Sequence, residues 1–456
     1  MARDVSDTTP IGARSELVEW VASGEKPRES WRLGTEHEKI PFYKADASPV
    51  PYEGERGIRA LLEGMQDRTG WAPIMEDGHP IGLYDEAGGG AISLEPGGQF
   101  ELSGAPLATL HETARETAQH LRDVKSVGET LGLGFLTLGM SPLWTRQQTP
   151  VMPKARYRIM TNYMPKVGNL GLDMMYRTST VQVNMDYASE ADMVKKLRVS
   201  LALQPIATAI FANSPFTESK PNGYLSMRSR IWRDTDPHRT GMMAFAFEDG
   251  FGYERYVDWA LDVPMYFVKR DATYHDVAGA SFRDLLAGEL AAMPGERATH
   301  SDWANHVSTL FPEVRLKRYL EMRGADVGNP DHIVALSAFW TGLLYDEAVL
   351  DGAWELVKRW SAGEREQLRA DVPKLALKAT IAGRSVQDVA SDALALARAG
   401  LQRRARLDEA GRDETRYLAY AEEIVASGRT QAERLLERYH GDWQGSVRPA
   451  FEECVY

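Results

Sequence analysis

The sequence predicts an α+β fold built around an antiparallel sheet. Strand-like segments precede and interleave with long amphipathic helices. The Glu-Pro-Gly-Gly-Gln segment at 95–99 is typical of a tight turn between antiparallel neighbours. No Gly-x-Gly-x-x-Gly or Gly-Lys-Ser/Thr motif occurs in the chain, which argues against a doubly wound sheet with a dinucleotide site or a P-loop.

In the first third of the chain, residues 107–131 give the clearest helical pattern, because apolar side chains recur at helical spacing with charges between them. Shorter helices are expected at 15–22 and 57–69. Strands are expected at 33–42, 71–74, 81–84 and 135–140. The polar, basic stretch at 152–165 is expected to be a connection, partly loop.

Further along, the strand at 178–187 is followed by Ser189, a typical helix N-cap, with Asp192 in place of the usual Glu of a capping box. That helix is expected to reach about 212. Residues 213–249 are irregular and rich in Gly, Pro, Arg and Asp, and loops of this length are usually functional. The remaining elements are expected as a strand at 263–269, a helix at 282–290, a strand at 315–322 and helices from about 332 onward.

No low-complexity linker marks a boundary, so a single catalytic domain over 1–456 is expected. Its sheet-based core would span 33–330, and a helical region at 331–456 would pack on it. The chain has 456 residues, 43% of them hydrophobic, and can bury a large core. A net charge of −12 argues against a nucleic-acid partner. The longest apolar run, at 201–212, is too short to cross a membrane.

Cysteine content and the start of the chain bear on location. The only cysteine, Cys454, can form neither an intrachain disulfide nor a structural zinc site. The first 20 residues lack an apolar run, so no signal or transit peptide is expected. A reducing cytoplasm is therefore the expected location. Either a monomer or a homodimer fits the sequence.

Four strand-like segments carry polar residues two positions apart, and in an extended chain such residues point to the same face. The four pairs are Glu36 and Glu38, Gln99 and Glu101, Gln182 and Asn184, and Glu321 and Arg323. Together they predict a polar, charged sheet surface. Such a surface is costly unless ions occupy it.

The carboxylates on this surface point to a metal. A single glutamate in a strand is usually a partly exposed residue of the sheet face. Five in segments that share the alternation repel one another and need cations, which favours Mg²⁺ ligation. The five candidate ligands are Glu36, Glu38, Glu95, Glu101 and Glu321. Gln182 fits the same face as a neutral oxygen ligand or a hydrogen-bond partner of phosphate.

Basic residues form two groups, one with Lys154, Arg156 and Arg158 and the other with Arg228, Arg230, Arg233 and Arg239. Arg156 and Arg228 are the better candidates for an inward-facing site, because apolar or aromatic neighbours can orient a guanidinium that grips carboxylate or phosphate at two points. Met265 and Tyr266 belong to an aromatic and methionine-rich stretch that is more often core, although it would suit a small thiol ligand.

Covalent catalysis is not expected, because the chain has no Gly-x-Ser-x-Gly nucleophile and no usable cysteine. What remains is a site for several Mg²⁺ ions with phosphate-binding arginines. That combination points to phosphoryl transfer, where catalysis is mostly positioning and charge neutralisation.

Several long motifs resemble the plant-type glutamate–cysteine ligases, a type that also occurs in proteobacteria. The resemblance extends from about 33 to 344. The motifs are Gly-Thr-Glu-His-Glu-Lys at 34–39, Ser-Leu-Glu-Pro-Gly-Gly-Gln-Phe-Glu-Leu-Ser-Gly at 93–104, Met-Pro-Lys-Ala-Arg-Tyr at 152–157, Met-Arg-Ser-Arg-Ile-Trp at 227–232, Asp-Thr-Asp at 234–236, Arg-Thr-Gly at 239–241 and Lys-Arg-Tyr-Leu-Glu-Met-Arg-Gly-Ala-Asp at 317–326.

This resemblance implies a glutamine-synthetase-like antiparallel sheet forming a cup and the first step of glutathione synthesis. ATP would phosphorylate the γ-carboxylate of glutamate, and the amine of cysteine would displace phosphate. The five glutamates would ligate Mg²⁺. The nucleotide would lie beside Gln182, Asn184 and Lys154. Arg156 and Arg228 would hold glutamate and the phosphoryl group, Arg323 would neutralise transition-state charge, and Tyr266 with Met265 would help form the cysteine pocket.

No plastid-targeting extension is expected, and the cysteine pairs of the plant members have no counterpart here beside the single Cys454, so the activity is expected to be independent of disulfide state. Two alternative functions stay open. One is a ligase on the same scaffold with a different amine acceptor. The other is a non-catalytic glutamate- or nucleotide-binding regulator, which the carboxylate set disfavours because a pure binder gains little from several phosphate-bridging metal ligands.

Overall fold

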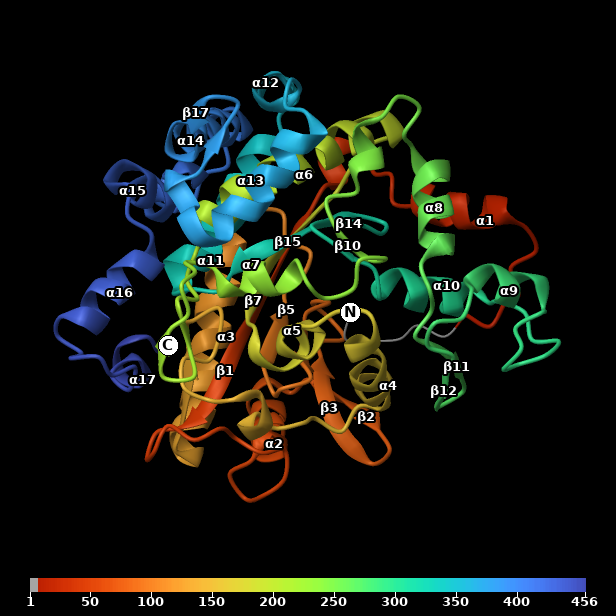
Figure 1. The fold of residues 1–456 in the computed structure, drawn as a ribbon, viewed down its shortest axis with the longest axis horizontal. Helices are drawn as coiled ribbons and strands as arrows, with labels where there is room; N and C mark the ends of the chain where they lie inside the picture. Colours follow the sequence, from red (N-terminus) through yellow and green to blue (C-terminus); the bar gives the residue numbers. More distant parts are fainter. Residues whose placement is uncertain (1–6) are drawn as a thin grey trace.

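The computed structural model describes residues 7–456, so the first six residues of the N-terminal segment lie outside it. Over that range, nine strands form one fully antiparallel sheet in the order β14-β15-β7-β1-β5-β4-β3-β2, with β6 paired to β1 (Figure 1). The strands are β1 Leu33–Tyr43, β2 Ala72–Glu76, β3 His79–Tyr84, β4 Ala91–Leu94, β5 Phe100–Ser103, β6 Leu133–Leu136, β7 Thr180–Met185, β14 Val314–Leu316 and β15 Leu320–Asp326. The predicted α+β class with an antiparallel sheet is confirmed.

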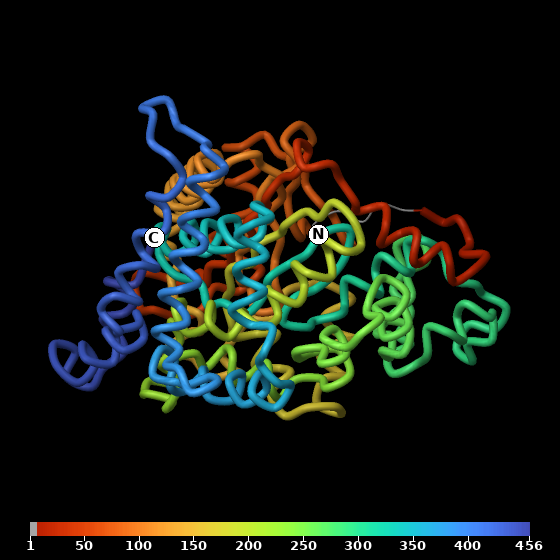
Figure 2. Tube along the Cα trace, turned by 90° about the horizontal axis from the view of Figure 1, so that it is seen from above, coloured from red at the N-terminus to blue at the C-terminus, as the bar shows by residue number. Residues whose placement is uncertain are grey.

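Helices surround this sheet, and the C-terminal region consists mainly of helices. They are α1 Arg14–Ala22, α2 Ile58–Thr69, α3 Leu110–Leu131, α4 Ala155–Tyr163, α5 Gly171–Arg177, α6 Glu190–Ile210, α7 Met227–Trp232, α8 Tyr253–Asp262, α9 Phe282–Ala287, α10 His300–Ser308, α11 Pro330–Leu344, α12 Glu347–Val357, α13 Ala362–Leu375, α14 Val386–Arg404, α15 Ala419–Ser427, α16 Gln431–His440 and α17 Ala450–Glu453. Figure 2 shows α1 beside the green segment that contains α8, at the far end of the molecule from the blue C-terminal helices.

Short two-stranded sheets occur in the connections between these elements. They are β8 Phe216–Thr217 with β9 Lys220–Pro221, β10 Thr240–Gly241 with β13 Phe311–Pro312, β11 Phe267–Arg270 with β12 Thr273–Asp276, and β16 Thr380–Ile381 with β17 Arg384–Ser385. Among the described residues no single helix is long and apolar enough to span a membrane. The pair α11 and α12 meets that test only jointly, across a 95° bend.

Local sequence explains where the long helices begin and end. Thr109 accepts a hydrogen bond from the Glu112 backbone N–H (3.2 Å), and the Glu112 carboxylate accepts one from the Thr109 N–H (2.8 Å), which forms a capping box. Gly132 ends α3 in the left-handed region at φ +69°, where a glycine carries no steric cost. Ser189 caps α6 as predicted, accepting from the Asp192 N–H at 3.2 Å.

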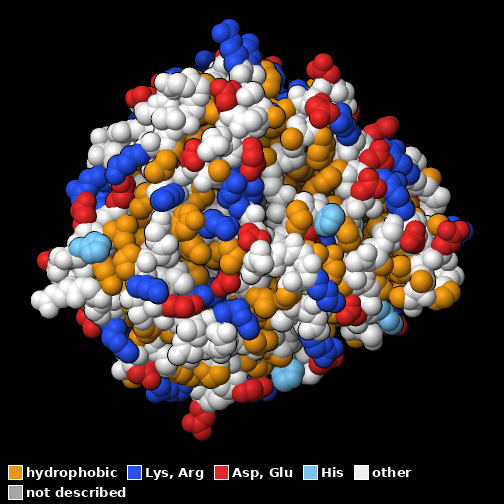
Figure 3. Space-filling view, viewed as in Figure 1, with side chains coloured by type: hydrophobic (Ala, Val, Ile, Leu, Met, Phe, Trp, Pro, Cys, Tyr) orange, Lys and Arg blue, Asp and Glu red, His pale blue; other side chains and the backbone are white. Residues whose placement is uncertain are grey.

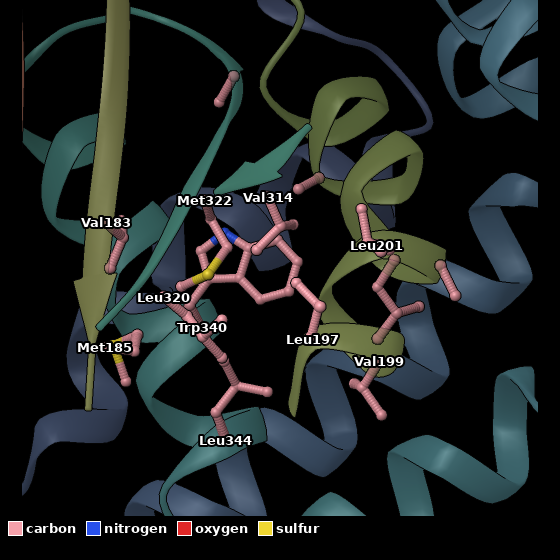
Figure 4. Packing of buried hydrophobic residues seen from close by; sticks show 14 of the residues in the cluster. Val183, Met185, Leu197, Val199, Leu201, Val314, Leu320, Met322, Trp340 and Leu344 are labelled. Carbon is pink, nitrogen blue, oxygen red and sulfur yellow. The ribbon is translucent and has the colours of Figure 1, made fainter. Parts of the chain in front are cut away.

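Side chains alternate along the strands, so that core residues lie on one face of the sheet and the candidate site residues lie on the other. On β7, Val181, Val183 and Met185 are fully buried on one face. On β15, Leu320 and Met322 face the same core, where Figure 4 shows them packed with Trp340 of α11 and Leu197 of α6. The intervening polar residues of these strands therefore project to the opposite face, as the sequence predicts.

Two of the differences from expectation bear on the site. Residues 152–165 contain helix α4, whose buried Tyr157, Met160 and Tyr163 recur at a spacing of three residues within a basic stretch that masks the pattern. The single strand expected at 315–322 is a hairpin of β14 and β15, closed by a hydrogen bond from the Lys317 N–H to the Tyr319 carbonyl (2.9 Å). The hairpin decides what surrounds Glu321, because it places a second strand beside that residue.

Candidate active site

The four segments with paired polar residues include three whole strands and a turn that leads into a fourth, and these strands are neighbours in the order β15-β7-β1-β5. Glu36 on β1 lies opposite Gln182 on β7. Glu38 lies opposite Glu101 on β5, and Glu101 lies opposite Ser93 on β4. Segments that are almost 300 residues apart in sequence thus supply one polar sheet face.

A cavity of about 1090 Å³, including its open mouth, lies over this face. Its charged lining combines carboxylates and guanidiniums: Glu36, Glu38, Glu95, Glu101, Arg156, Arg228, Arg315, Lys317 and Arg323. Gln182 also lines it, and Met160, Met174, Met175, Trp232, Phe267 and Phe311 provide apolar walls. Figure 3 shows acidic and basic side chains side by side near the middle of the face that is also seen in Figure 1.

The cavity carboxylates are buried and repel one another. Burial raises the pKa of Glu38 well above its usual value, and the nearby Glu101 and Glu95 raise it further. Burial also raises the pKa of Glu101, with Glu95 adding to the effect. The Ser93 hydroxyl donates to Glu101 at 2.6 Å and the Thr180 N–H donates to Glu38 at 3.0 Å. Both donors are neutral, and burial with mutual repulsion still raises both pKa values, so a cation in the cavity would stabilise the ionised carboxylates.

The donor set fits magnesium. Every candidate ligand atom is an oxygen, which hard divalent cations prefer. Within residues 7–456 no three acidic, cysteine or histidine side chains converge on one point, so the acids would act singly or in pairs. That pattern suits Mg²⁺, which is usually held by one or two carboxylates together with substrate phosphates. Glu36, Glu38, Glu95 and Glu101 are the residues that would hold it.

Glu321 differs from the other four glutamates in its surroundings. It is fully buried, and Arg315 grips it through Nε (2.6 Å) and Nη2 (2.9 Å). Arg323 Nη1 donates to it at 2.8 Å, and Lys317 Nζ lies 3.5 Å away. Burial alone would raise the pKa of Glu321, but these three cations hold it well below the usual value. Three basic side chains therefore surround the glutamate that the sequence analysis assigns to the metal as a fifth ligand.

The arginines at the cavity keep donor atoms for an anion. Arg323 donates from Nη1 to Gln182 at 2.6 Å, and Arg228 donates from Nη2 to the Arg323 carbonyl at 2.7 Å. The Nε atoms of both arginines are buried without a hydrogen-bond partner. An orphaned buried donor is costly. A carboxylate or phosphate in the cavity would relieve that cost, which supports an anionic ligand at this point.

Hydrogen bonds to Asp326 hold the segment that carries Arg228 in place. Asp326 accepts from the Asn213 N–H (2.8 Å), Ser214 Oγ (2.7 Å) and Ser226 Oγ (2.9 Å), so it ties both ends of the 213–226 loop to β15. Ser226 in turn caps α7, which carries Arg228. One buried carboxylate therefore holds the 213–226 part of the irregular region in place.

A second cavity, of about 1200 Å³ including its open mouth, meets the first at Glu36. Asn184, Lys26, Arg32, Asp186 and Tyr319 are among its lining residues. Asn184 Nδ2 donates to Glu36 Oε1 at 2.8 Å, so this pair lies at the boundary between the two cavities.

Comparison with known proteins decides the family. The model of Glutamate-cysteine ligase family 2 (GCS2) matches residues 32–453. The chain belongs to glutamate-cysteine ligase family 2. It is 56% identical over 443 residues to the chloroplastic glutamate–cysteine ligase of Nicotiana tabacum, covering 97% of this chain and 83% of that protein.

Other relatives agree. Chloroplastic glutamate–cysteine ligase B of Oryza sativa subsp. japonica is 54% identical over 99% of this chain and 89% of its own length. The chloroplastic enzyme of Arabidopsis thaliana is 54% identical over 98% and 84%. A solved structure of glutamate–cysteine ligase from Francisella tularensis, in complex with AMP, shares the fold with a TM-score of 0.54 at 10% identity, covering 93% of this chain and 88% of that one.

These relatives correct the expectation of a cytoplasmic location, because they are named as chloroplastic enzymes. The expectation rested mainly on the cysteine content, which does not specify a compartment. A single cysteine limits disulfide formation, and it does not distinguish one reducing compartment from another. Cys454 itself is buried, and burial raises the pKa of its thiol to about 12.

Three other residues assigned from the family resemblance lie away from the first cavity. Lys154 donates to the Leu94 carbonyl at 2.8 Å and so ties α4 to β4. Met265 and Tyr266 are buried among core side chains, and the Arg239 guanidinium lies 3.7 Å from the Tyr266 ring centre. Successive side chains point in different directions at this position, and the adjacent Phe267 lines the cavity instead of Met265 or Tyr266.

The sequence-based site omitted Arg315 and Lys317, which both line the cavity. A hairpin with its turn at 317–319 places Arg315 directly opposite Glu321. Opposite charges at facing positions of antiparallel strands are a favourable pair. The pairing of Arg315 with Glu321 could therefore be predicted from the sequence, provided that residues 314–326 are divided into two strands.

Proposed function

We propose that this family member catalyses ATP-dependent formation of the amide bond between the γ-carboxylate of L-glutamate and the amine of L-cysteine. The observation that carries the proposal is the first cavity, where four carboxylates that form no ion pair within residues 7–456 share the wall with Arg156, Arg228 and Arg323. A carboxylate substrate, a triphosphate and divalent cations together satisfy both sets of groups.

In the first step, a γ-carboxylate oxygen of glutamate attacks the γ-phosphorus of ATP, and the bond between that phosphorus and the β–γ bridging oxygen breaks to release ADP. Arg228 and Arg323, which line the cavity, would hold the carboxylate and the transferring phosphoryl group. When bound, Mg²⁺ would neutralise phosphate charge. Positioning and charge neutralisation are the main catalytic contributions in phosphoryl transfer.

In the second step, the cysteine amine attacks the carbonyl carbon of the acyl phosphate, the C–O bond to phosphate breaks, and the amine gives up a proton as inorganic phosphate leaves. The apolar wall supports cysteine as the acceptor. Met160, Met174 and Met175 with Phe267 present thioether sulfur and an aromatic ring. A thiol packs well against both.

The second cavity is proposed to hold the nucleotide. It opens beside Glu36 and Asn184, so a triphosphate entering from it would reach the carboxylates of the first cavity. Lys26, Arg32 and Tyr319 supply cationic and aromatic groups at its wall. Glutamate and ATP would then approach the same carboxylates from different sides, which keeps the acyl phosphate away from open solvent.

An amine-acceptor panel tests the proposal. Purified protein with ATP, Mg²⁺ and glutamate is assayed for ADP release with cysteine, 2-aminobutyrate, glycine or no acceptor. Cysteine should stimulate ADP release most, with 2-aminobutyrate next because it has the same shape without the thiol. Stimulation by a different amine alone would assign another ligase of the same scaffold. No stimulation by any amine would leave a nucleotide- or glutamate-binding regulator.

A further inference from the structure

Beyond the two cavities lies a third concave site, rich in arginine, which the proposed reaction does not use. It has a volume of about 940 Å³ including open space, and we name it the arginine cleft. Its charged lining residues are Arg28, Arg32, Arg403, Arg404, Arg406, Glu29 and Asp346. Five positive and two negative charges give it a formal charge of +3, in a chain whose net charge is −12. A local excess of this sign attracts anions.

The positive charge is only partly neutralised by the protein. Arg403 pairs with Asp346 at 3.0 Å, and Arg404 lies 3.4 Å from Glu414. Arg28 reaches Glu347 only at 3.7 Å. Over residues 7–456, neither Arg32 nor Arg406 forms an ion pair. The Arg32 guanidinium donates to backbone carbonyls, those of Trp31 (2.9 Å) and Glu29 (3.4 Å). Two guanidiniums in a concave site are therefore available to an anion.

The aromatic residues of the cleft are already covered. Lys196 Nζ lies 3.5 Å from the centre of the Trp31 ring, and Tyr345 packs on Trp31 with ring centres 4.8 Å apart. A nucleobase would have to compete with these contacts to stack there. The cleft is thus suited to recognise charge and guanidinium geometry, which are features of a phosphate chain.

The cleft shares its wall with the second cavity. Arg32 lines both. The Tyr345 hydroxyl bridges the two sites, because it donates to the Arg32 carbonyl and accepts from the Asp186 N–H at 2.7 Å. Asp186, a lining residue of the second cavity, also binds Lys26 at 2.7 Å and the Arg32 N–H at 2.7 Å. A ligand that pulls Arg32 into the cleft changes the charge presented to the second cavity.

We propose that the arginine cleft binds a multivalent phosphate anion and that its occupancy changes nucleotide affinity in the second cavity. The coupling, though not the binding itself, rests on the nucleotide assignment made under the proposed function. Coupling between two sites is reciprocal, so nucleotide in the second cavity changes affinity for the anion by the same factor.

Binding is tested by titrating inorganic triphosphate, with excess Mg²⁺, into enzyme loaded with one equivalent of a non-hydrolysable ATP analogue, so that the analogue occupies the second cavity and leaves the cleft open. Wild-type protein should bind one further equivalent of triphosphate. The double variant Arg403→Ser/Arg406→Ser should bind it at least tenfold more weakly. The matched control is Arg384→Ser/Arg398→Ser, which removes two arginines that pair elsewhere with Asp392 and Glu422, and it should stay within twofold of wild type. No further equivalent, or equal weakening in both variants, overturns the proposal.

Two further measurements separate the sources of the phosphate and the effect on nucleotide. ATP and inorganic triphosphate should compete for the cleft at similar concentrations, since the phosphate chain alone is recognised. A strong preference for ATP overturns that part. The affinity for the ATP analogue should change about fivefold or more when triphosphate is present, as expected for a typical coupling. An unchanged affinity refutes the coupling, and failure of the analogue to bind at all refutes the nucleotide assignment while leaving the triphosphate titration interpretable.

Light scattering tests the remaining alternative, in which a second copy of the chain occupies the cleft. The mass of the protein in solution should be the same for wild type and for Arg403→Ser/Arg406→Ser. A loss of mass in the double variant would mean that the cleft is an interface between copies, which overturns the assignment to a small anion.

Discussion

Glu321 should stabilise the fold and hold the cavity arginines in place, and it should not bind the metal. Its side chain is fully buried and its two closest bonds to Arg315 are 2.6 and 2.9 Å. Breaking a buried ion pair from one side costs about 3–5 kcal/mol, because the other charge stays buried without its partner. Glu321→Gln and Arg315→Met should each lower the free energy of unfolding by about that amount.

The double variant Glu321→Gln/Arg315→Met removes both charges, so its loss of stability should be smaller than the sum of the single losses by about 1–3 kcal/mol. Urea unfolding at neutral pH, followed by tryptophan fluorescence, measures all three. The stabilisation depends on pH with a defined sign. Because the folded-state pKa of Glu321 lies well below its ordinary value of 4.5, the stabilising contribution is present above about 4.5 and is lost as the pH falls towards the folded-state pKa.

Magnesium dependence separates the two roles. The concentration of Mg²⁺ at half-maximal rate should be within twofold of wild type for Glu321→Gln, whatever happens to the maximal rate. If that concentration rises tenfold while the free energy of unfolding is unchanged, then Glu321 is a metal ligand and the ion-pair assignment is refuted.

The remaining predictions concern the cavity, the core and the cysteine. Replacing Glu38 or Glu101 by Gln should raise the half-saturating Mg²⁺ concentration at least tenfold and leave the urea midpoint unchanged or higher, because both carboxylates are buried against mutual repulsion; a normal Mg²⁺ requirement in both would misplace the metal. Arg228→Lys should lower kcat by about 10²–10³ with the fold intact, as for loss of one transition-state donor, and near-normal turnover would count against its role. Trp340→Ala should cost about 3–5 kcal/mol in urea unfolding, since the ring is fully buried; a cost below about 1 kcal/mol would contradict the packing described. Activity should change less than twofold across a reductant titration, because Cys454 is a buried thiol with its pKa raised to about 12, and a severalfold change would require a disulfide between copies.

Sequence alone was sufficient to predict which candidate residues share one sheet face where they lie on regular strands. Glu36 and Glu38 share a face because side chains alternate along an extended chain, and the same rule grouped Gln182 with Asn184. It also separated these residues from Val183 and Met185, which lie in the core. The long helix α3 followed from periodicity and from its Thr109 cap, both of which are local properties of the chain.

Local rules did not reveal which groups would neutralise each carboxylate. Glu321 and Glu101 look alike in sequence, since each lies on a strand with apolar neighbours. Only the hairpin register places Arg315 across from Glu321, while Glu101 meets Ser93 and Glu38. Contacts between strands therefore decide that Glu321 forms ion pairs with three basic residues, whereas Glu101 accepts a hydrogen bond from the neutral Ser93.

The sequence by itself determined the α+β class, the polar alternation and the family motifs, because each is written in spacings of a few residues. Only the tertiary structure decided that Met265 and Tyr266 lie in the core, that Lys154 binds a backbone carbonyl, and that Arg32 lines both the arginine cleft and the second cavity. The physical reason is that burial and charge pairing depend on which distant segments approach within a few ångströms, and local periodicity does not carry that information.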